Sequence, residues 1–529
     1  MIRFQSWVFD HTFVLKIEGR VSSLQERLVT RLVKTLINAA VKRFTAKIAV
    51  SLTASLYILF SAIASAQIAE GNQRNALPEI GVVASDTISI NKEIQIGDIL
   101  MRQLRGQAPL INDPLLDEYL QDLGNRLVAQ SDNVKFPFKF FLLNSADINA
   151  FAFFGGHIGV HTGLIFNADN ESELASVLAH EIAHVTQRHI ARKIQAQQKA
   201  SPLQLASLFG GLLLAIANPE AGIAAVSATN AAAQQSSINY TRSNEKEADR
   251  IGMQILAQAG YDPRASATFF QKLAEKYRLR STPFAYLLTH PLPQSRIADA
   301  RSRAQAFDVR QVPEKLSFHL AKARIIARYY GNPKDNITYF ESILENQRYV
   351  FKQFAEYGLA LTYFENEQFA ESKAIIDRLR RSEPENLFYI DLATDIAIAQ
   401  KQFASAVDML EEQARRAPRN RVISLNLANV LIKKGDIDQA TNVLKDYLLV
   451  NPDNMLALQL LSEAYGESRQ LLEMHQSKAE VYALVAAYPR AIDELHTAYN
   501  FAGERRIEKQ RIRARIDQFR EAQDRLKAL

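Results

Sequence analysis

Two histidines and a glutamate lie within five residues, in a segment rich in helix-forming residues. His180, Glu181 and His184 make the pattern His-Glu-x-x-His. On a helix that turns about 100° per residue, His180 and His184 fall within about 40° of each other. Two imidazoles placed in this way can bind one Zn²⁺ at about 2.0–2.1 Å. Glu181 projects beside them, where it could act as the general base for a water molecule at the metal.

The third metal ligand must come from another part of the chain. The sequence contains no Cys, so only His and carboxylate side chains are available as strong ligands. His189 is a tempting choice, nine residues after His180. Gln187 and Arg188 are expected to continue the helix, so His189 faces about the opposite side, away from the His pair. We therefore predict that His189 is not a ligand.

Two carboxylates one helical turn apart follow about sixty residues later. Glu245 and Asp249 lie in the segment 240–252, and apolar residues at helical intervals give that segment a buried face. A carboxylate that completes a His₂Glu site, with another that orients a ligand imidazole, is ordinary zinc-enzyme construction. By itself the segment would be read as a solvated, charged helix face. The paired imidazoles need a further ligand, so one of these two carboxylates is expected to bind the metal and the other to orient a ligand histidine.

A further histidine opens the segment His290-Pro-Leu-Pro-Gln-Ser-Arg296. Prolines stiffen this loop and can hold His290 in a fixed place, and Arg296 begins a predicted helix. His290 could fill an open fourth metal position and keep an enzyme latent. It could instead donate a hydrogen bond to a developing oxyanion. A loop that only caps the domain is the third reading.

Residues 90 to 305 resemble the M48 family of zinc metallopeptidases. Four segments carry the resemblance: Gly155-Gly-x-Ile-Gly-Val-x-Thr-Gly163, His180-Glu-x-x-His184, Arg242-x-x-Glu245-x-x-x-Asp249 and His290-Pro-x-x-x-x-Arg296. The resemblance implies one zinc ion per chain, held by His180, His184 and Glu245, with Glu181 activating water and Asp249 supporting a ligand. His290 and Arg296 then belong to the same site. The chain departs from the family at His157 and His161, where an aromatic residue and an Asn are expected, and at Thr241, where a Ser is usual.

The elements that must position these residues are predicted from their patterns. Helices are expected over 93–105 and 114–131, because apolar residues recur at helical intervals. The alternating, aromatic segment 136–143 predicts a strand, and a second extended segment covers 149–165. A single catalytic helix is expected over 171–197.

The glycines of the second extended segment would weaken a strand unless another backbone approaches it closely. In a protease that backbone could be an extended substrate added to the sheet edge. A plain hairpin is the alternative. His157 and His161 share one face of this strand about 13 Å apart, and we expect them at the surface or in a groove. The apolar run 203–217 is too short to span a bilayer; burial against the catalytic helix is preferred to a peripheral contact with a membrane.

The C-terminal half repeats with a period of 34 residues. Pro384, Pro418 and Pro452 are each followed by one residue and then Asn. This period is typical of tetratricopeptide repeats, whose helix pairs stack into a solenoid with a concave binding face. About four to five repeats are expected over 320–500. The tail is expected to form a basic capping helix.

The N-terminal part predicts export. Basic residues precede an uncharged run from Ile48 to Phe60, and Ala64-Ser-Ala66 follows as a cleavage signal. The net charge of +6 is modest for 529 residues and does not favour nucleic-acid binding. The predicted organisation is an α+β zincin-like metallopeptidase domain, mostly helical with a small sheet, followed by an all-α repeat solenoid. The boundaries are 1–66 for the extension and signal peptide, 67–92 for an irregular linker, 93–310 for the peptidase domain, 316–503 for the repeats and 504–529 for the basic helix.

Export, an M48-like domain and repeats together resemble the M48 proteases of the Gram-negative periplasm. The resemblance implies a periplasmic zinc endopeptidase that degrades misfolded or stalled outer-membrane β-barrel proteins and assists their assembly. Its substrates would be unfolded or misassembled barrel proteins, and the repeats would contact the barrel assembly machinery. The alternative is a repeat-based periplasmic chaperone or adaptor in which the zinc site is latent or structural.

Overall fold

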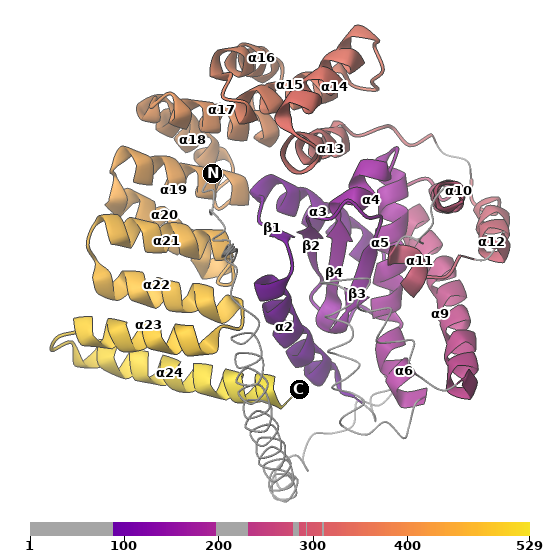
Figure 1. Ribbon diagram of the computed structural model, residues 1–529, viewed down its shortest axis with the longest axis horizontal. Helices are drawn as coiled ribbons and strands as arrows, with labels where there is room; N and C mark the ends of the chain where they lie inside the picture. Colours follow the sequence, from indigo (N-terminus) through magenta and orange to yellow (C-terminus); the bar gives the residue numbers. More distant parts are fainter. Residues whose placement is uncertain (1–87, 197–230, 279–284, 293, 309–310, 529) are drawn as a thin grey trace, which may run out of the picture. The chain divides into compact units, whose positions relative to one another are not determined.

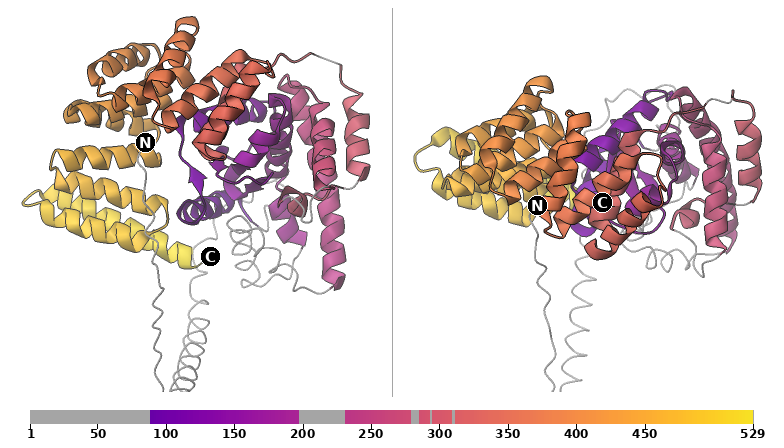
Figure 2. Two further views of the ribbon diagram at one scale, coloured as in Figure 1. Left: turned by 45° about the horizontal axis from the view of Figure 1, so that its top comes forward. Right: turned by 90° about the horizontal axis from the view of Figure 1, so that it is seen from above.

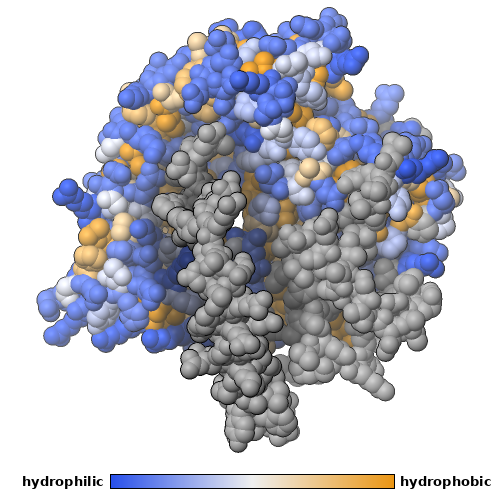
Figure 3. Space-filling model, in the orientation of Figure 1, coloured by the Kyte–Doolittle hydropathy of each residue, from blue (hydrophilic) through white to orange (hydrophobic). Residues whose placement is uncertain are grey.

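A computed structural model describes residues 88–196, 231–278, 285–292, 294–308 and 311–528. The predicted signal peptide, its cleavage site after Ala66 and the apolar run 203–217 lie outside these residues. Among the described helices none has the length and apolar character needed to cross a bilayer. In the face shown in Figure 3, hydrophilic residues cover much of the described surface.

Two amphipathic helices begin the peptidase part. Helix α2 covers Ile90–Gln107 and begins at an N-cap, Ser89, whose side chain accepts a hydrogen bond from the Lys92 amide. Helix α3 covers Pro114–Val128, with Pro at its first position and Asp113 as N-cap. Both predicted helices are confirmed, although α2 starts three residues before the expected boundary at residue 93.

Four short strands form one sheet in the order β1-β2-β4-β3. Their bounds are Leu110–Ile111, Lys139–Leu143, Ala150–Phe153 and His157–His161 for β1 to β4. Strand β2 pairs in parallel with β4, and β3 pairs antiparallel with β4. Strand β3 is therefore an edge of the described sheet.

The second predicted extended segment is a hairpin that ends in a helix. Strands β3 and β4 are joined by a 3₁₀ turn, η2 (Phe154–Gly156), and helix α4 (Thr162–Asn167) follows β4 directly. The glycines serve the protein's own packing. Gly155 has a φ of 76°, and a Cβ at Gly163 would lie 2.3 Å from the Ala146 carbonyl oxygen. A substrate backbone is not needed to explain them.

His157 and His161 are buried, with exposed fractions of 1% and 2%, so the expectation of a surface or groove position was wrong. The ring of His157 stacks on Phe153, with centroids 4.9 Å apart. His161 meets Phe151 edge to face. Both histidines belong to the packed side of the hairpin and lie outside the group of possible metal ligands.

The predicted helix over 171–197 is two helices. Helix α5 covers Glu171–Thr186 and helix α6 covers His189–Ala196. Between them Arg188 adopts a left-handed backbone, with φ of 51°. The expectation that Gln187 and Arg188 continue the helix was therefore wrong, and the direction of the chain changes just before His189.

Helix α5 lies at the centre of the peptidase part (Figure 1). One side packs against the sheet and α3, and the other against the long helix α9 (Ala231–Gln258). Three shorter helices complete this part: α10 (Ala265–Tyr277), α11 (Ala285–Thr289) and α12 (Gln294–Ala304). The residues 171–186 are buried on nearly all sides because the helix is enclosed in this way.

The C-terminal half is helical throughout its described residues. Its helices are α13 (Leu316–Tyr329), α14 (Pro333–Glu345), α15 (Lys352–Glu365), α16 (Phe369–Ser382), α17 (Leu387–Ala399), α18 (Phe403–Arg416), α19 (Arg421–Lys434), α20 (Ile437–Val450), α21 (Met455–Glu467), α22 (Leu471–Leu484), α23 (Tyr488–Phe501) and α24 (Arg506–Lys527). Figure 2 shows them stacked in sequence order, from orange to yellow. Five consecutive pairs run from α13 to α22, the upper end of the predicted number.

The repeated Pro-x-Asn segments explain how each pair begins. Asn386, Asn420 and Asn454 are the N-caps of α17, α19 and α21, and each side chain accepts a hydrogen bond from a backbone amide in the first turn. The proline two residues earlier lies after the end of the preceding helix, which it cannot continue. The last helix, α24, covers the predicted basic tail and buries Ile512, Ile516 and Phe519.

The peptidase part and the repeats pack against each other. Helix α13 contacts α3 and α4, and α19 also contacts α3. One hydrophobic cluster contains residues of both parts, among them Leu116 and Phe318. Arg324 of α13 is 1% exposed and its Nε lies 2.7 Å from an oxygen of Asp113, the N-cap of α3. The first repeat is therefore joined to the peptidase part by both apolar and charged contacts.

Candidate metal centre

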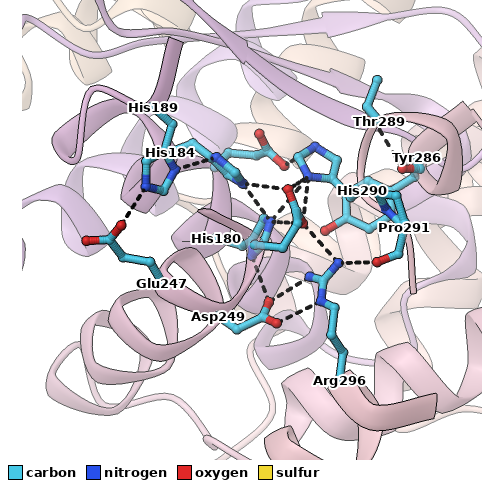
Figure 4. A network of polar contacts seen from close by, with 12 residues as sticks. His180, His184, His189, Glu247, Asp249, Tyr286, Thr289, His290, Pro291 and Arg296 are labelled. Carbon is cyan, nitrogen blue, oxygen red and sulfur yellow. Dashed lines mark hydrogen bonds and ion pairs between the residues drawn. The ribbon is translucent and has the colours of Figure 1, made fainter. Parts of the chain in front are cut away.

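Four side chains from three elements converge beside α5. His180 and His184 come from α5, and His290 follows the end of α11 (Figure 4). Glu245 comes from α9. One ligand atom from each lies within 4.8 Å of the others. His180, Glu245 and His290 are buried, and His184 is partly buried. The predicted pairing of Glu245 with the two histidines is present.

The spacing of these atoms fits a tetrahedral metal ion. Donors bound at about 2.0–2.1 Å in a tetrahedron lie about 3.3 Å from one another. The Nε2 atoms of His180 and His184 are 3.0 Å apart, and each lies 3.4 Å from an oxygen of Glu245. Nδ1 of His290 is 3.1 Å from both Glu245 oxygens and 3.4 Å from His180 Nε2. Two imidazoles, a carboxylate and a third imidazole at these distances suit Zn²⁺.

Glu181 lies next to this group without belonging to it. Its carboxylate is 1% exposed, and Oε1 is 3.4 Å from Nε2 of His290. Burial raises the pKa of Glu181, while the neighbouring His290 and His180 oppose that rise. The backbone of Ala152 in the edge strand β3 also hydrogen-bonds Glu181. A proton acceptor therefore lies between the metal group and the edge strand of the described sheet.

Asp249 and Arg296 support the group from the far side of His180. Asp249 Oδ1 is 3.0 Å from His180 Nδ1. Arg296 donates two hydrogen bonds to Asp249, at 2.8 and 2.7 Å. It also lies 2.9 Å from Glu245 and donates to the Pro291 carbonyl. Burial alone would raise the pKa of Asp249, but the bonds from His180 and Arg296 outweigh it and keep that pKa below its usual value.

Close packing of α9 on α5 brings Glu245 and Asp249 to the histidines. The contact is made at Gly252, where a Cβ would lie 3.0 Å from the Cα of His180. A side chain at this position would require the two helix backbones to move apart by a few tenths of an ångström. The glycine three residues after Asp249 is the sequence signal for this approach.

Two neighbours of the site were not expected there from the sequence. Tyr286, four residues before His290, stacks on that imidazole with centroids 4.7 Å apart. Its hydroxyl is buried and has no hydrogen-bond partner among the described residues. His189, rejected as a ligand, lies outside the metal group but its Nδ1 is 2.8 Å from Nδ1 of His184. The position of His189 agrees with the prediction that it is not a ligand. The reason given for that prediction was wrong, because the helix ends at Thr186 and does not continue to His189.

Comparison with known proteins identifies the family. The model of peptidase family M48 matches residues 114–304, and a tetratricopeptide-repeat model matches residues 397–464. A Vibrio cholerae protein is 43% identical over 454 residues, which cover 86% of this chain and 94% of that protein. The beta-barrel assembly-enhancing protease of Escherichia coli strain K12 is 42% identical over 477 residues, 89% of this chain and 96% of the relative. A mitochondrial metalloendopeptidase of Bos taurus is 35% identical over 159 residues, 28% of this chain and 29% of that protein. With the His₂Glu group in place, this chain belongs to peptidase family M48 and is a zinc metalloendopeptidase with C-terminal tetratricopeptide repeats.

Proposed function

We propose that His180, His184 and Glu245 bind the zinc ion and that Glu181 is the general base. The distances among the three ligands support this assignment, because they match those of donors around one tetrahedral ion. Asp249 and Arg296 orient His180 and Glu245. The peptidase domain is proposed to extend over 93–310 and the repeats over 316–503.

The ion, when bound, supplies a Lewis acid that polarises a peptide carbonyl and makes a water molecule more acidic. Glu181 accepts the proton of the attacking water, and its burial beside the ligands keeps it close to that water. The same carboxyl can then donate the proton to the leaving amine. Among the described residues, each of the other carboxylates near the group already contacts a ligand histidine, an arginine or both.

Strand β3 is the proposed docking edge for the substrate. It has no neighbour on its outer side among the described strands, and its Ala152 contacts Glu181. An extended peptide that pairs with β3 would pass beside the general base. Backbone pairing selects conformation more than sequence, so the enzyme would favour unfolded, strand-forming chains.

We infer that these chains are outer-membrane β-barrel proteins that have failed to assemble. The support is the 42% identity to a protein named beta-barrel assembly-enhancing protease, over nearly the whole of both chains. The proposed location is the periplasm, with a signal peptide cleaved after Ala66. The repeats would hold the client or the assembly machinery near the peptidase and so raise its effective concentration.

Cleavage of one barrel protein in two states tests this function. The purified chain is incubated with an outer-membrane β-barrel protein diluted from urea, and with the same protein folded in detergent micelles. We expect cleavage of the unfolded form at least about tenfold faster, because only free strands can pair with β3. A chelator should abolish it. Equal cleavage of both forms, or of neither, would contradict the proposed specificity.

The alternative, a repeat-based chaperone or adaptor, has support in the helical pairs of the C-terminal half. In that case binding of the unfolded barrel protein would matter and its hydrolysis would not. A variant that binds zinc but cannot transfer the proton separates the two functions, as described in the Discussion.

His290 is proposed to act as a latch, because its Nδ1 is as close to Glu245 and His180 as a fourth ligand would be. Replacing His290 by Ala should raise peptidase activity. If the latch stabilises the closed site by about 1.4 kcal/mol, the increase is about tenfold. Steady-state cleavage of a fluorescent peptide measures it. Thr289→Ala is the control, since Thr289 is the last residue of α11, beside His290, and its hydroxyl donates to the Tyr286 carbonyl and not to a metal-group atom. A fall in activity would instead assign His290 to stabilisation of the transition state.

A further inference from the structure

The imidazole of His184 is hydrogen-bonded on the side away from the metal group. Its Nε2 faces His180 and Glu245, and its Nδ1 lies 2.8 Å from Nδ1 of His189. An imidazole that binds a metal through Nε2 carries its proton on Nδ1. His184 therefore donates this hydrogen bond, and Nδ1 of His189 accepts it.

The proton on His189 must then be on Nε2, and the structure has an acceptor there. His189 Nε2 is 3.2 Å from an oxygen of Glu247. The same oxygen accepts a hydrogen bond from Arg192 at 2.8 Å. His189 is 4% exposed, whereas the side chains of Glu247 and Arg192 are each 28% exposed. The row of hydrogen-bonded side chains His184, His189 and Glu247 therefore begins in the buried site and ends at a carboxylate near the surface.

The two ligand histidines are supported in parallel ways. His180 reaches the carboxylate of Asp249 directly, and Arg296 holds that carboxylate. His184 reaches the carboxylate of Glu247 through one intervening imidazole. Both rows end at a carboxylate paired with an arginine, and both fix the tautomer and plane of a ligand ring.

The break between α5 and α6 is what places His189 in this row. Continued helix would carry His189 away from His184, as the sequence analysis expected. Instead Arg188 takes a left-handed backbone, which is unfavourable for a non-glycine residue unless its surroundings hold it. Its side chain is buried against Glu93 of α2, with Nε donating at 2.8 Å, and it also donates to the Ile88 carbonyl at 2.6 Å. These contacts offset the cost of the turn.

We propose that His189 and Glu247 are positioning residues for zinc, which hold the His184 imidazole in the tautomer and orientation that binding requires. The proposal rests on the zinc assignment of the preceding section. The competing explanation is that the row only joins α6 to α9 and has no effect on zinc binding. The two explanations differ in what they predict for the metal-free protein.

The test measures the zinc dissociation constant of the purified full chain by competition with a chromogenic chelator. His189→Phe keeps the ring volume but removes both hydrogen bonds, and should weaken zinc binding by about 10- to 100-fold. His189→Gln offers an acceptor and a donor, and should restore most of that loss. Glu247→Ala should weaken binding by about tenfold, at the lower end of the range. The melting temperature of the metal-free protein should not change in any of them.

His319→Phe is the matched control. His319, in α13, is also buried, and its Nε2 lies 3.1 Å from an oxygen of Glu314, just before that helix. This variant should bind zinc like the unmodified chain. Should His189→Phe fail to fold, Glu247→Ala still tests the row from its partly exposed end.

Two results would overturn the proposal. One is unchanged zinc affinity in His189→Phe or, where that variant does not fold, in Glu247→Ala. The other is equal weakening in His189→Phe and His189→Gln, since hydrogen bonding would then be irrelevant. Glu245→Gln separates these two results from failure of the zinc assignment. If Glu245 is a ligand, this variant should lose zinc affinity whether or not His189 and Glu247 contribute to binding. Unchanged affinity in Glu245→Gln would reject the assignment itself.

Discussion

Replacing Glu181 by Gln is expected to lower the rate of peptide hydrolysis by about 10²- to 10⁴-fold, the usual contribution of a positioned general base. The amide has the shape of the carboxylate but cannot accept the proton of the attacking water. Glu181 lies beside the metal group and outside its ligands, so the zinc content should stay at one per chain. Cleavage of unfolded barrel protein and metal analysis of the same sample measure both quantities.

Glu356→Gln is the control for this variant. Glu356 is also a buried glutamate, 7% exposed, but it lies in α15 of the repeats and pairs with Lys352 and Arg378. Its replacement should leave hydrolysis unchanged. Full activity in Glu181→Gln would reject Glu181 as the base. Loss of hydrolysis with unchanged outer-membrane phenotypes in cells would favour the adaptor function.

Replacing Arg324 by Ala is expected to lower the free energy of unfolding by about 3–5 kcal/mol, as for other buried ion pairs that lose one partner. Arg324 is 1% exposed and bridges Asp113 of the peptidase part and Asp391 of α17, at 2.7 and 2.8 Å. It also donates to the Tyr357 hydroxyl at 3.0 Å. Without it two buried carboxylates lose their main counter-charge. Urea unfolding followed by circular dichroism measures the change.

Arg419→Ala is the matched control, because Arg419 pairs with Asp446 at 2.7 Å on the surface, with side chains 46% and 52% exposed. An exposed pair contributes about 0–1 kcal/mol. The two variants should therefore differ by several kcal/mol. A loss in Arg324→Ala no greater than that of the control would show that the charged contact between α3 and the repeats contributes little to stability.

Sequence patterns predicted those parts of the fold that depend on residues close together in the chain. The His pair lies one helical turn apart on α5, and Glu245 joins it from α9. The Pro-x-Asn period predicted the repeats, and the structure supplies its reason: each Asn caps a helix. Capping and helical periodicity depend on residues a few positions apart, so they can be read from sequence.

Features that depend on distant contacts were missed. Nothing near Arg188 signals the end of α5, because the turn is held by Glu93, ninety-five residues away. The glycines of the β3–β4 hairpin left a choice between substrate approach and a plain hairpin, and their close neighbours all belong to this chain. The burial of His157 and His161 follows from the helices and rings that cover the hairpin. A pattern of residues does not show what will pack against it.

Diffraction data collected on both sides of the zinc absorption edge show whether these three side chains bind zinc. We expect one anomalous peak per chain, about 2.0–2.2 Å from Nε2 of His180, Nε2 of His184 and a carboxylate oxygen of Glu245. A peak elsewhere, or a Glu245 side chain turned beyond coordinating distance of the two imidazoles, would contradict it.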